Sequence, residues 1–334
     1  MDEKQIADLL WKVEVYKGKR SEILRELGIP RSTYYKWRRA FREQGHEGLK
    51  RTPSARQRVW NRLLPEEREE VLRIAKQHPE LSSRLLSVKI TDEGEFSISE
   101  STVFRILKEN SLIAPRPVED MPAAKEWRHK TKRPDELWQC DATNIFVVGW
   151  GYYKLIPVLD DFSRKIIADI LRPDESAYSV ADAVELAIEK AQLEGHIQDG
   201  KMPKLYTDNG PGFASNLMNE YVTTRGIKHI FGTPYHPQGR GKIERFNRTI
   251  KENVCMVVYC SPDELEAATR DGIDTYNNTP HEALKNVSPN DVYAGRQHEI
   301  LQRRKEKKIL TMERRKKYNL RSANNDPNQG HSAK

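Results

Sequence analysis

YTDNG at Tyr206–Gly210 and HPQGRGKIERFNRT at His236–Thr249 are the two stretches that decide the fold of this 334-residue chain. The first is a short apolar run that ends in a carboxylate and a glycine-bearing turn. The second is a loop rich in Pro and Gly that runs into a polar helix, and this helix carries a further carboxylate, Glu244. Between Asp208 and Glu244 lie 35 residues.

A third carboxylate lies upstream, in LWQCDATNIFVV at Leu137–Val148. The aromatic and β-branched content of this stretch predicts a strand, with Asp141 inside it. If the three acids converge they repel each other, and divalent cations would neutralise them. Oxygen ligands without Cys or His favour magnesium or manganese over zinc. Asp141, Asp208 and Glu244 are therefore our candidate catalytic and metal-binding residues, with two ions about 3.5–4 Å apart for in-line displacement at phosphorus.

The three acids, with this spacing between the second and third, resemble the D, D and E signature of insertion-sequence transposases, whose core is related to retroviral integrases. Two further stretches are similar to that family: YKLIPVLDDFSRKI at Tyr153–Ile166 and YNNTPHEAL at Tyr276–Leu284. The resemblance covers roughly residues 134 to 292, and several motifs carry it together. Asp160 and Asp161 are alternative metal ligands, although their position before Ser163 favours a turn.

The resemblance implies an α/β fold for residues 137–292: an RNase H-like catalytic core with a mixed five-stranded sheet and flanking helices. Strands are expected near 137–148, 152–159, 165–171, 204–207 and 228–231, and helices near 177–193, 216–225 and 244–257. The activity implied is that of a transposase, with DNA integration and recombination at two Mg²⁺ (or Mn²⁺) ions per active site. The partners implied are the double-stranded DNA of the element ends and of the target, and further copies of the chain on that DNA.

An all-α helix-turn-helix domain is predicted over residues 1–48. Its third helix, from Arg31 to Glu43, places Tyr34, Trp37 and Phe41 on one face. The opposite face is polar and suits the major groove of DNA; its members are Ser32, Tyr35, Lys36 and Arg39. The alternative is a three-helix bundle whose polar face is merely solvated.

A second helix-turn-helix domain is expected over residues 65–113, with helices near 65–77, 81–91 and 100–110. Ser97 and Glu100 have the spacing of a capping box at the start of the last helix. The outer face of this helix supplies the DNA-binding candidates Thr102, Arg105 and Lys108. The periodicity by itself indicates only an amphipathic helix.

Three further segments are basic. Residues 49–64 and the Pro-rich residues 114–136 are predicted linkers. Residues 293–334 have too few apolar side chains for a core, so we expect them to lie along DNA or to stay disordered until they do.

On the helix of Glu244, the cationic Arg248 and Lys251 share the acid's face and are candidate DNA contacts. For Arg248 the alternative is an ordinary surface pair with Glu244.

Composition agrees with a polyanionic partner. The 57 Lys and Arg residues outnumber the 49 Asp and Glu residues, which gives a net charge of +8 and favours nucleic acid. Three cysteines without Cys-x-x-Cys spacing predict a reducing, cytoplasmic setting. With DNA as the partner, we expect the chain at the nucleoid. We expect no membrane partner, because no run approaches the length of a membrane span. A retroviral-type integrase would need an N-terminal His/Cys zinc module, whose spacing is missing from the sequence.

Two other classes of protein fit less well. A DNA-binding regulator without catalytic activity would have no need of all three acids. A nuclease acting on RNA–DNA hybrids would have no need of two DNA-reading domains and a basic tail.

Overall fold

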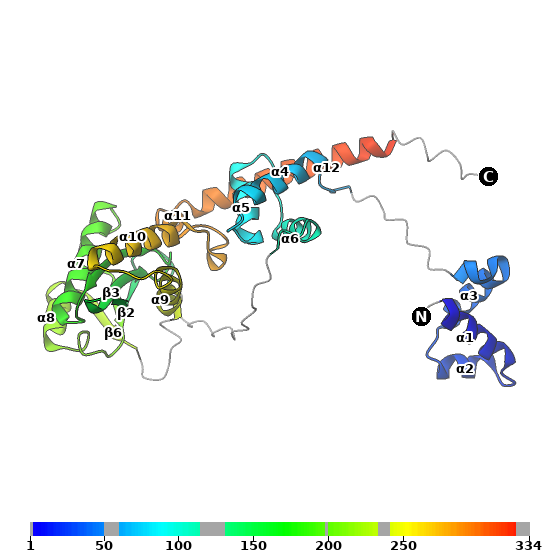
Figure 1. Cartoon of the computed structure of the whole chain (residues 1–334), viewed down its shortest axis with the longest axis horizontal. Coiled ribbons are helices and arrows are strands. Elements are labelled where there is room, and N and C mark those ends of the chain that lie inside the picture. Colours follow the sequence, from blue (N-terminus) through cyan, green and yellow to red (C-terminus); the bar gives the residue numbers. More distant parts are fainter. Residues whose placement is uncertain (1–2, 50–59, 114–130, 198–199, 233–240, 325–334) are drawn as a thin grey trace. The chain divides into compact units, whose positions relative to one another are not determined.

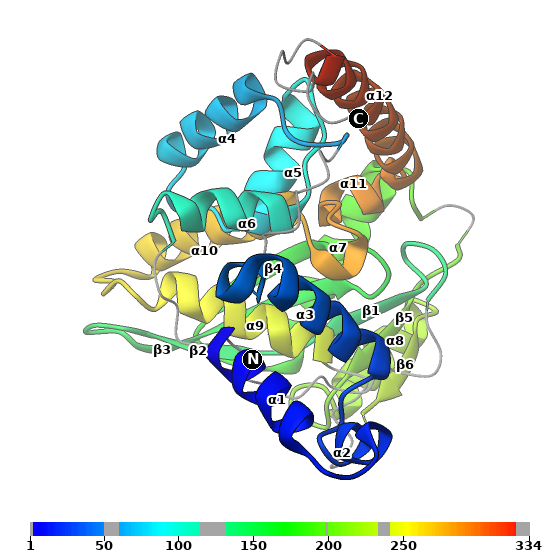
Figure 2. The same cartoon turned by 90° about the vertical axis from the view of Figure 1, so that its right-hand side faces the viewer.

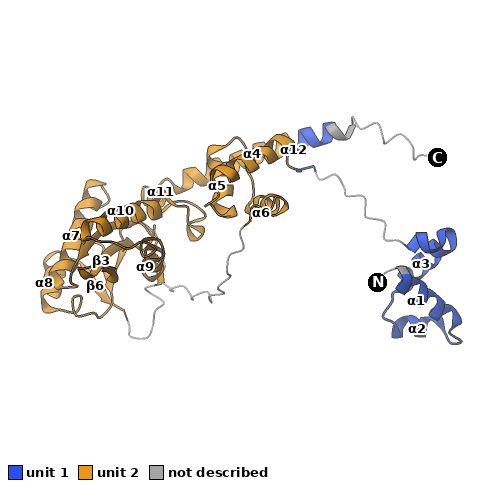
Figure 3. Ribbon diagram, in the orientation of Figure 1, with its two compact units in different colours: residues 1–62, 315–334 blue, residues 63–314 orange. Residues whose placement is uncertain are grey.

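The computed structural model describes residues 3–49, 60–113, 131–197, 200–232 and 241–324 (Figure 1). The chain divides into two compact units, residues 1–62 with 315–334 and residues 63–314 (Figure 3). Most of the two predicted linkers, His236 and the end of the predicted tail lie outside the described residues. None of the described helices is long and apolar enough to cross a membrane.

The first unit begins with three helices and a short 3-10 helix, which are α1 (Glu3–Val15), α2 (Arg20–Glu26), α3 (Arg31–Gln44) and η1 (Gly45–Leu49). Gly28, with φ of +66°, provides the left-handed turn that ends α2. Tyr34 is fully buried in the core of this domain, and Trp37 and Phe41 pack against that core. The aromatic face of α3 therefore seats the helix as the sequence predicts.

A second helical domain opens the other unit, with α4 (Pro65–Gln77), α5 (Ser83–Glu93) and α6 (Glu100–Glu109). Val103, Ile106 and Leu107 of α6 are buried, as its periodicity predicts. The predicted capping box is wrong, because Ser99 directly precedes the helix and its side chain makes no cap hydrogen bond. The backbone N–H of Ser97 instead donates to Thr311 Oγ1 at 2.9 Å.

The second unit also contains a mixed sheet of six strands, β1 (Leu137–Cys140), β2 (Thr143–Val147), β3 (Gly151–Asp160), β4 (Ile166–Arg172), β5 (Lys204–Thr207) and β6 (Lys228–Phe231). β3 pairs antiparallel with β1, β2 and β4, and β5 pairs parallel with β1 and β6. The sheet has six strands rather than the expected five because the first predicted strand is interrupted at Asp141. In the register that β1 and β2 share, Asp141 lies opposite Pro157, which has no N–H to donate to the ladder.

Two layers of helices enclose this sheet (Figures 1 and 2). α7 (Ala177–Leu193) and α8 (Asn216–Thr224) cover one face, where Trp138 and Cys140 are buried. α9 (Gly241–Val254) and α10 (Pro262–Asn278) cover the other face, where Ile145 and Leu155 are buried. Neighbouring residues of one strand therefore point to different helical layers.

The C-terminal segment has more structure than the sequence predicts. After η3 (Glu282–Leu284) and α11 (Pro289–Tyr293), a long helix α12 extends over Gln297–Asn324. The expectation of disorder is wrong for this described part. Ile300 and Leu301 near the start of the helix pack against a small apolar cluster of Leu284, Val287 and Val292. Polar contacts tie the next turns to the end of α5: Arg304 forms a two-pronged ion pair with Asp92 at 2.6 and 2.7 Å, and Lys307 donates to the carbonyl oxygens of Thr91 and Gly94.

Candidate active site

Parallel pairing of β1 with β5 brings two of the three acids together. The register pairs Leu137 with Lys204 and Gln139 with Tyr206. The same register, continued by two residues along each chain, places Asp141 beside Asp208. Adjacent strands lie about 4.8 Å apart. Both aspartates directly follow their strands and are half-buried. The carboxyl ends of two neighbouring parallel strands thus carry a carboxylate each.

The first turns of helix α9, which carry Glu244, contact the strand that ends at Asp141. Asn247 Nδ2 donates to Asp141 Oδ2 at 2.9 Å, and the backbone N–H of Ile243 donates to Gln139 Oε1 at 3.3 Å. Glu244 is exposed and lies one helical turn before Asn247. The first turns of α9 are therefore fixed to the strand that ends at Asp141.

The residues present suit a hard divalent cation. Asp141, Asp208 and Glu244 offer carboxylate oxygens, the ligands that Mg²⁺ and Mn²⁺ prefer. In the part of the chain that the structure describes, no three Asp, Glu, His or Cys side chains are already grouped closely enough to hold a metal ion. Like-charged carboxylates repel one another in the absence of a cation, and Asp141, Asp208 and Glu244 are the residues that would hold one.

Glu175 is a fourth acid at this site, and sequence reasoning missed it. A methyl group added at Gly210 would lie 2.9 Å from Asp208 Oδ1 and 3.1 Å from Glu175 Oε1. The two carboxylates therefore border the same small space. Lys154 Nζ holds Glu175 by an ion pair of 3.1 Å. The only sequence signal was its position directly before Ser176, the residue that caps α7.

The buried thiol of Cys140 lies under the influence of the negative charges at this edge of the sheet. Burial raises the pKa of its thiol well above the usual range, and the negative charges of Asp141, Asp208 and Glu175 raise it further. The thiol is thus held in its neutral form. Asp141, Asp208 and Glu175 are thus all close enough for their charges to act on this thiol, and their negative charge would attract a cation.

Asp160 and Asp161, the alternative metal ligands, are engaged in the structure around the end of β3. Asp160 accepts hydrogen bonds from the backbone N–H and the Oγ of Ser163, and burial raises its pKa to about 7. Asp161 pairs with Lys242 Nζ at 2.8 Å and accepts from Gln139 Nε2 at 2.7 Å. Asp160 thus has the turn role that its sequence position favours, and Asp161 ties α9 to the sheet.

The DNA-binding candidates lie mostly on exposed helix faces. The candidates on α3 and α9 are exposed, except for Lys251, which is half-buried. These residues are Ser32, Tyr35, Lys36, Arg39, Arg248 and Lys251. On α6, Arg105 and Lys108 are exposed and Thr102 is half-buried. Exposure makes these side chains available to a partner, and their contact with DNA stays a prediction.

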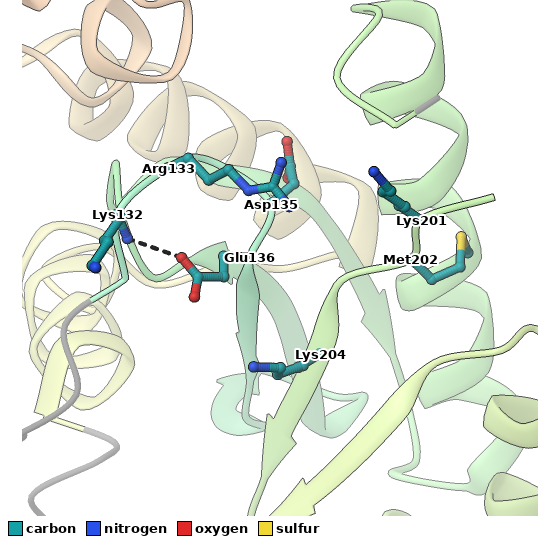
Figure 4. Close-up of a pocket in the computed structure, with 7 residues that line it drawn as sticks. All are labelled: Lys132, Arg133, Asp135, Glu136, Lys201, Met202 and Lys204. Atoms are coloured by element: carbon teal, nitrogen blue, oxygen red, sulfur yellow. Dashed lines mark hydrogen bonds between the residues drawn. The ribbon is translucent and has the colours of Figure 1, made fainter. Parts of the chain in front are cut away.

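A groove at the other end of the same strands is a separate feature (Figure 4). It is lined by Lys132, Arg133, Asp135, Glu136, Lys201, Met202 and Lys204. β1 and β5 begin here and run toward Asp141 and Asp208. The groove is therefore not part of the candidate active site.

Comparison with known proteins agrees with this architecture. Two profiles described as integrase core domain match residues 131–237 and 225–289. Two profiles described as homeodomain-like domain match residues 1–50 and 33–107. The matches therefore cover both the helical segments and the sheet that carries the three acids.

Individual relatives include the transposase of transposon Tn552 from Staphylococcus aureus, 27% identical over 260 residues, which cover 70% of this chain and 52% of the transposase. A Pol polyprotein of the feline endogenous virus ECE1 is 34% identical over 128 residues, 38% of this chain and 11% of the polyprotein. A solved structure of the HTLV-2 integrase catalytic core domain in complex with magnesium is 22% identical, with a TM-score of 0.38; the match covers 48% of this chain and 97% of that domain.

The chain spans about half the length of the Tn552 transposase and a smaller share of the viral polyprotein. The order of its domains, homeodomain-like segments followed by an integrase core, agrees with the order predicted from the sequence. Residues 131–289 of the chain thus match the integrase core domain, residues 1–107 match homeodomain-like domains, and the sequence is similar to a transposase over 70% of its length.

Proposed function

We propose that this chain is a DDE transposase, which binds the terminal inverted repeats of a mobile element, cleaves the DNA there and joins the freed 3′ hydroxyl to target DNA. The observation that carries the proposal is the parallel register that sets Asp141 beside Asp208, together with the hydrogen bond from Asn247 of α9 to Asp141. Both observations support a site at the carboxyl edge of two parallel strands, near the first turns of the helix that carries Glu244.

Asp141, Asp208 and Glu244 would hold two Mg²⁺ or Mn²⁺ ions. When bound, such ions activate the attacking oxygen and stabilise the leaving one. Cleavage and strand transfer are the same displacement at phosphorus with a different attacking oxygen, so one site serves both. Arg248 and Lys251, on the face of α9 that carries Glu244, would receive the phosphates of the substrate.

The helical domains would supply DNA recognition. The exposed Ser32, Tyr35, Lys36 and Arg39 of α3 suit one groove contact, and Thr102, Arg105 and Lys108 of α6 suit another. The basic α12 would add phosphate contacts. We further propose that copies of the chain assemble on DNA to hold two element ends, and that they act in the cytoplasm, on the nucleoid.

The test uses the full chain with Mg²⁺ and a duplex that carries the inverted repeats bordering the coding region. Asp141→Asn, Asp208→Asn and Glu244→Gln should each abolish cleavage and strand transfer, while affinity for the duplex persists. Glu252→Gln is the matched control, because Glu252 is an exposed acid of the same helix, and it should leave cleavage intact. If DNA binding is lost in parallel with cleavage, or if the three variants still cleave, the catalytic assignment is wrong.

A further inference from the structure

The hairpin of β2 and β3 presents aromatic side chains to solvent. Phe146, Trp150 and Tyr152 are 53%, 61% and 66% exposed. Phe146 and Tyr152 lie directly opposite each other on the two strands, with ring centroids 5.2 Å apart. Val148, near the tip, is 48% exposed. Large apolar side chains grouped in this way usually mark an interaction site.

A second apolar segment lies next to this hairpin. Met256, Val257 and Val258, which follow α9, are 85%, 61% and 72% exposed. The backbone N–H of Val148 donates to the carbonyl oxygen of Tyr259 at 3.0 Å, so the two segments meet. We call the seven exposed apolar side chains of these segments the hairpin patch: Phe146, Val148, Trp150, Tyr152, Met256, Val257 and Val258.

The hairpin patch is uncharged in a highly charged protein. Asp, Glu, Lys and Arg make up 32% of the chain, yet Ile145–Tyr153 and Asn253–Pro262 contain none of them. Binding to nucleic acid draws on Lys and Arg at the phosphates, and these segments offer neither. The composition suits an apolar protein surface as the partner.

The size of the hairpin patch is adequate for association of two copies. From the exposed fractions, its side chains present on the order of 600 Å² to solvent. Two such surfaces face to face would bury roughly 1,200 Å², above the ~1,000 Å² expected of a specific interface. The largest apolar patch of a typical monomer is about 300–600 Å² and is often functional.

The edge of the sheet supports a symmetric arrangement. β2 pairs with β3 on one side, and no other described strand pairs with it. Directly after β2 the Val148 N–H is already bonded to Tyr259, but the strand itself, Thr143–Val147, carries no charged side chain that would oppose pairing with another chain. An antiparallel pair formed by a strand and its own copy is self-complementary, as a two-fold axis requires.

We propose that the hairpin patch is an interface between two copies of this chain. It gives a surface for the oligomer proposed above, but it does not depend on DNA or on the three acids. A test without DNA therefore separates failure of this interface from failure of the proposed transposase activity.

The experiment uses the native thiols of the full chain. Cys255 and Cys260 are exposed in the segment that contributes Met256–Val258, whereas Cys140 is buried. A bis-maleimide should link two wild-type chains through Cys255 or Cys260, and Cys255→Ser with Cys260→Ser should abolish the link. Sedimentation should show a dimer that persists in about 1 M salt, because burial of apolar surface is not screened.

Trp150→Lys and Met256→Lys should each raise the dimer dissociation constant at least about tenfold and remove the cross-link. Both side chains are exposed, so folding should survive. Leu193→Lys, at an 87% exposed position on α7, is the matched control and should leave dimer and cross-link unchanged. A wild-type chain that stays monomeric and uncross-linked at ~50 μM would overturn the proposal, as would a cross-link that survives Trp150→Lys.

Two other occupants of the surface would also overturn the proposal. In the first case, single-stranded DNA protects Cys255 and Cys260 from maleimide while the protein keeps its oligomeric mass. The hairpin patch would then stack on DNA bases. If the thiols react slowly in a chain of monomeric mass, another segment of the same chain covers them.

Discussion

Asn247 Nδ2 donates a hydrogen bond of 2.9 Å to Asp141 Oδ2, which ties the helix of Glu244 to the strand of Asp141. Asn247 is buried, with 7% of its surface exposed. An amide is suited to this place because it is neutral: it can hold a carboxylate without adding to the negative charge already gathered there. Asn247 thus acts as a positioning residue for the proposed metal site.

Asn247→Ala should slow DNA cleavage about tenfold to a hundredfold at saturating Mg²⁺, because Asp141 loses a hydrogen bond to its charged form. Asn247→Asp should be more severe and should demand more Mg²⁺, because a second charge faces Asp141. Single-turnover cleavage over a range of Mg²⁺ concentrations measures both effects. Equal Mg²⁺ dependence of the two variants would contradict the positioning role.

Glu175→Gln should have a smaller effect than Asp208→Asn on cleavage, because we assign no metal to Glu175. Lys154→Met removes the cation that pairs with Glu175, so repulsion among the acids should grow and the Mg²⁺ concentration for half-maximal rate should rise. The double variant should restore the Mg²⁺ requirement of Glu175→Gln. Cleavage assays of the three variants over a range of Mg²⁺ concentrations measure these effects. If the effects of the two single substitutions simply add in the double variant, Lys154 and Glu175 are not coupled.

Lys108→Ala on α6 should weaken DNA binding and reduce the slope of log affinity against log salt concentration by about one. The physical reason is the loss of one phosphate contact and its released counterion. Lys76→Ala on α4 is the control, since Lys76 is also exposed but lies on a helix without predicted DNA contacts. Fluorescence anisotropy with the repeat duplex at several salt concentrations measures the slopes. Identical slopes for both variants would remove α6 from the proposed interface.

Arg304→Ala should release α12 from the second helical domain. The Arg304 and Asp92 side chains are 16% and 25% exposed, so their ion pair is largely shielded from water, and its loss should cost about 1.5–3 kcal/mol locally. Hydrogen exchange of Gln297–Arg314 should accelerate about tenfold or more. Lys305→Ala, at a neighbouring exposed position, should leave exchange unchanged, and similar exchange in both variants would show that the pair does not hold the helix.

His281 should make the second unit sensitive to acid. Burial lowers its pKa to about 4, and the nearby Arg164 and Arg84 charges act in the same direction. The unfolded chain binds a proton near pH 6.5, so this contribution is complete above that pH and is lost as pH falls toward 4. Between these pH values, His281→Gln should reduce the slope of the unfolding free energy against pH. The reduction is at most the slope that corresponds to one bound proton. Denaturant titrations between about pH 4 and 7 test this, and an unchanged slope would exclude His281.

The candidate residues of the site could be named from local sequence. The three acids occur in recognisable surroundings, an apolar run before Asp208 and a helix after a Pro- and Gly-rich loop before Glu244. The faces of α3 and α6 were equally readable, because the period of a helix fixes which side chains share a face. The matched integrase core and homeodomain-like domains agree with these features.

Contacts between distant segments could not be read in this way. Glu175 and Asn247 join the site only because the sheet and α9 bring them to Asp208 and Asp141. The helix α12 was not predicted because only Ile300 and Leu301 near its start pack on an apolar cluster, and the polar contacts to α5 that hold the next turns leave no apolar periodicity in the sequence.

The sequence by itself therefore determined which side chains can do chemistry and which helix faces can meet a partner, because both depend on residue type and local period. Only the tertiary structure decided which acids are neighbours. The reason is strand register: the parallel pairing of Gln139 with Tyr206 sets Asp141 beside Asp208, and no local pattern in either strand specifies that alignment.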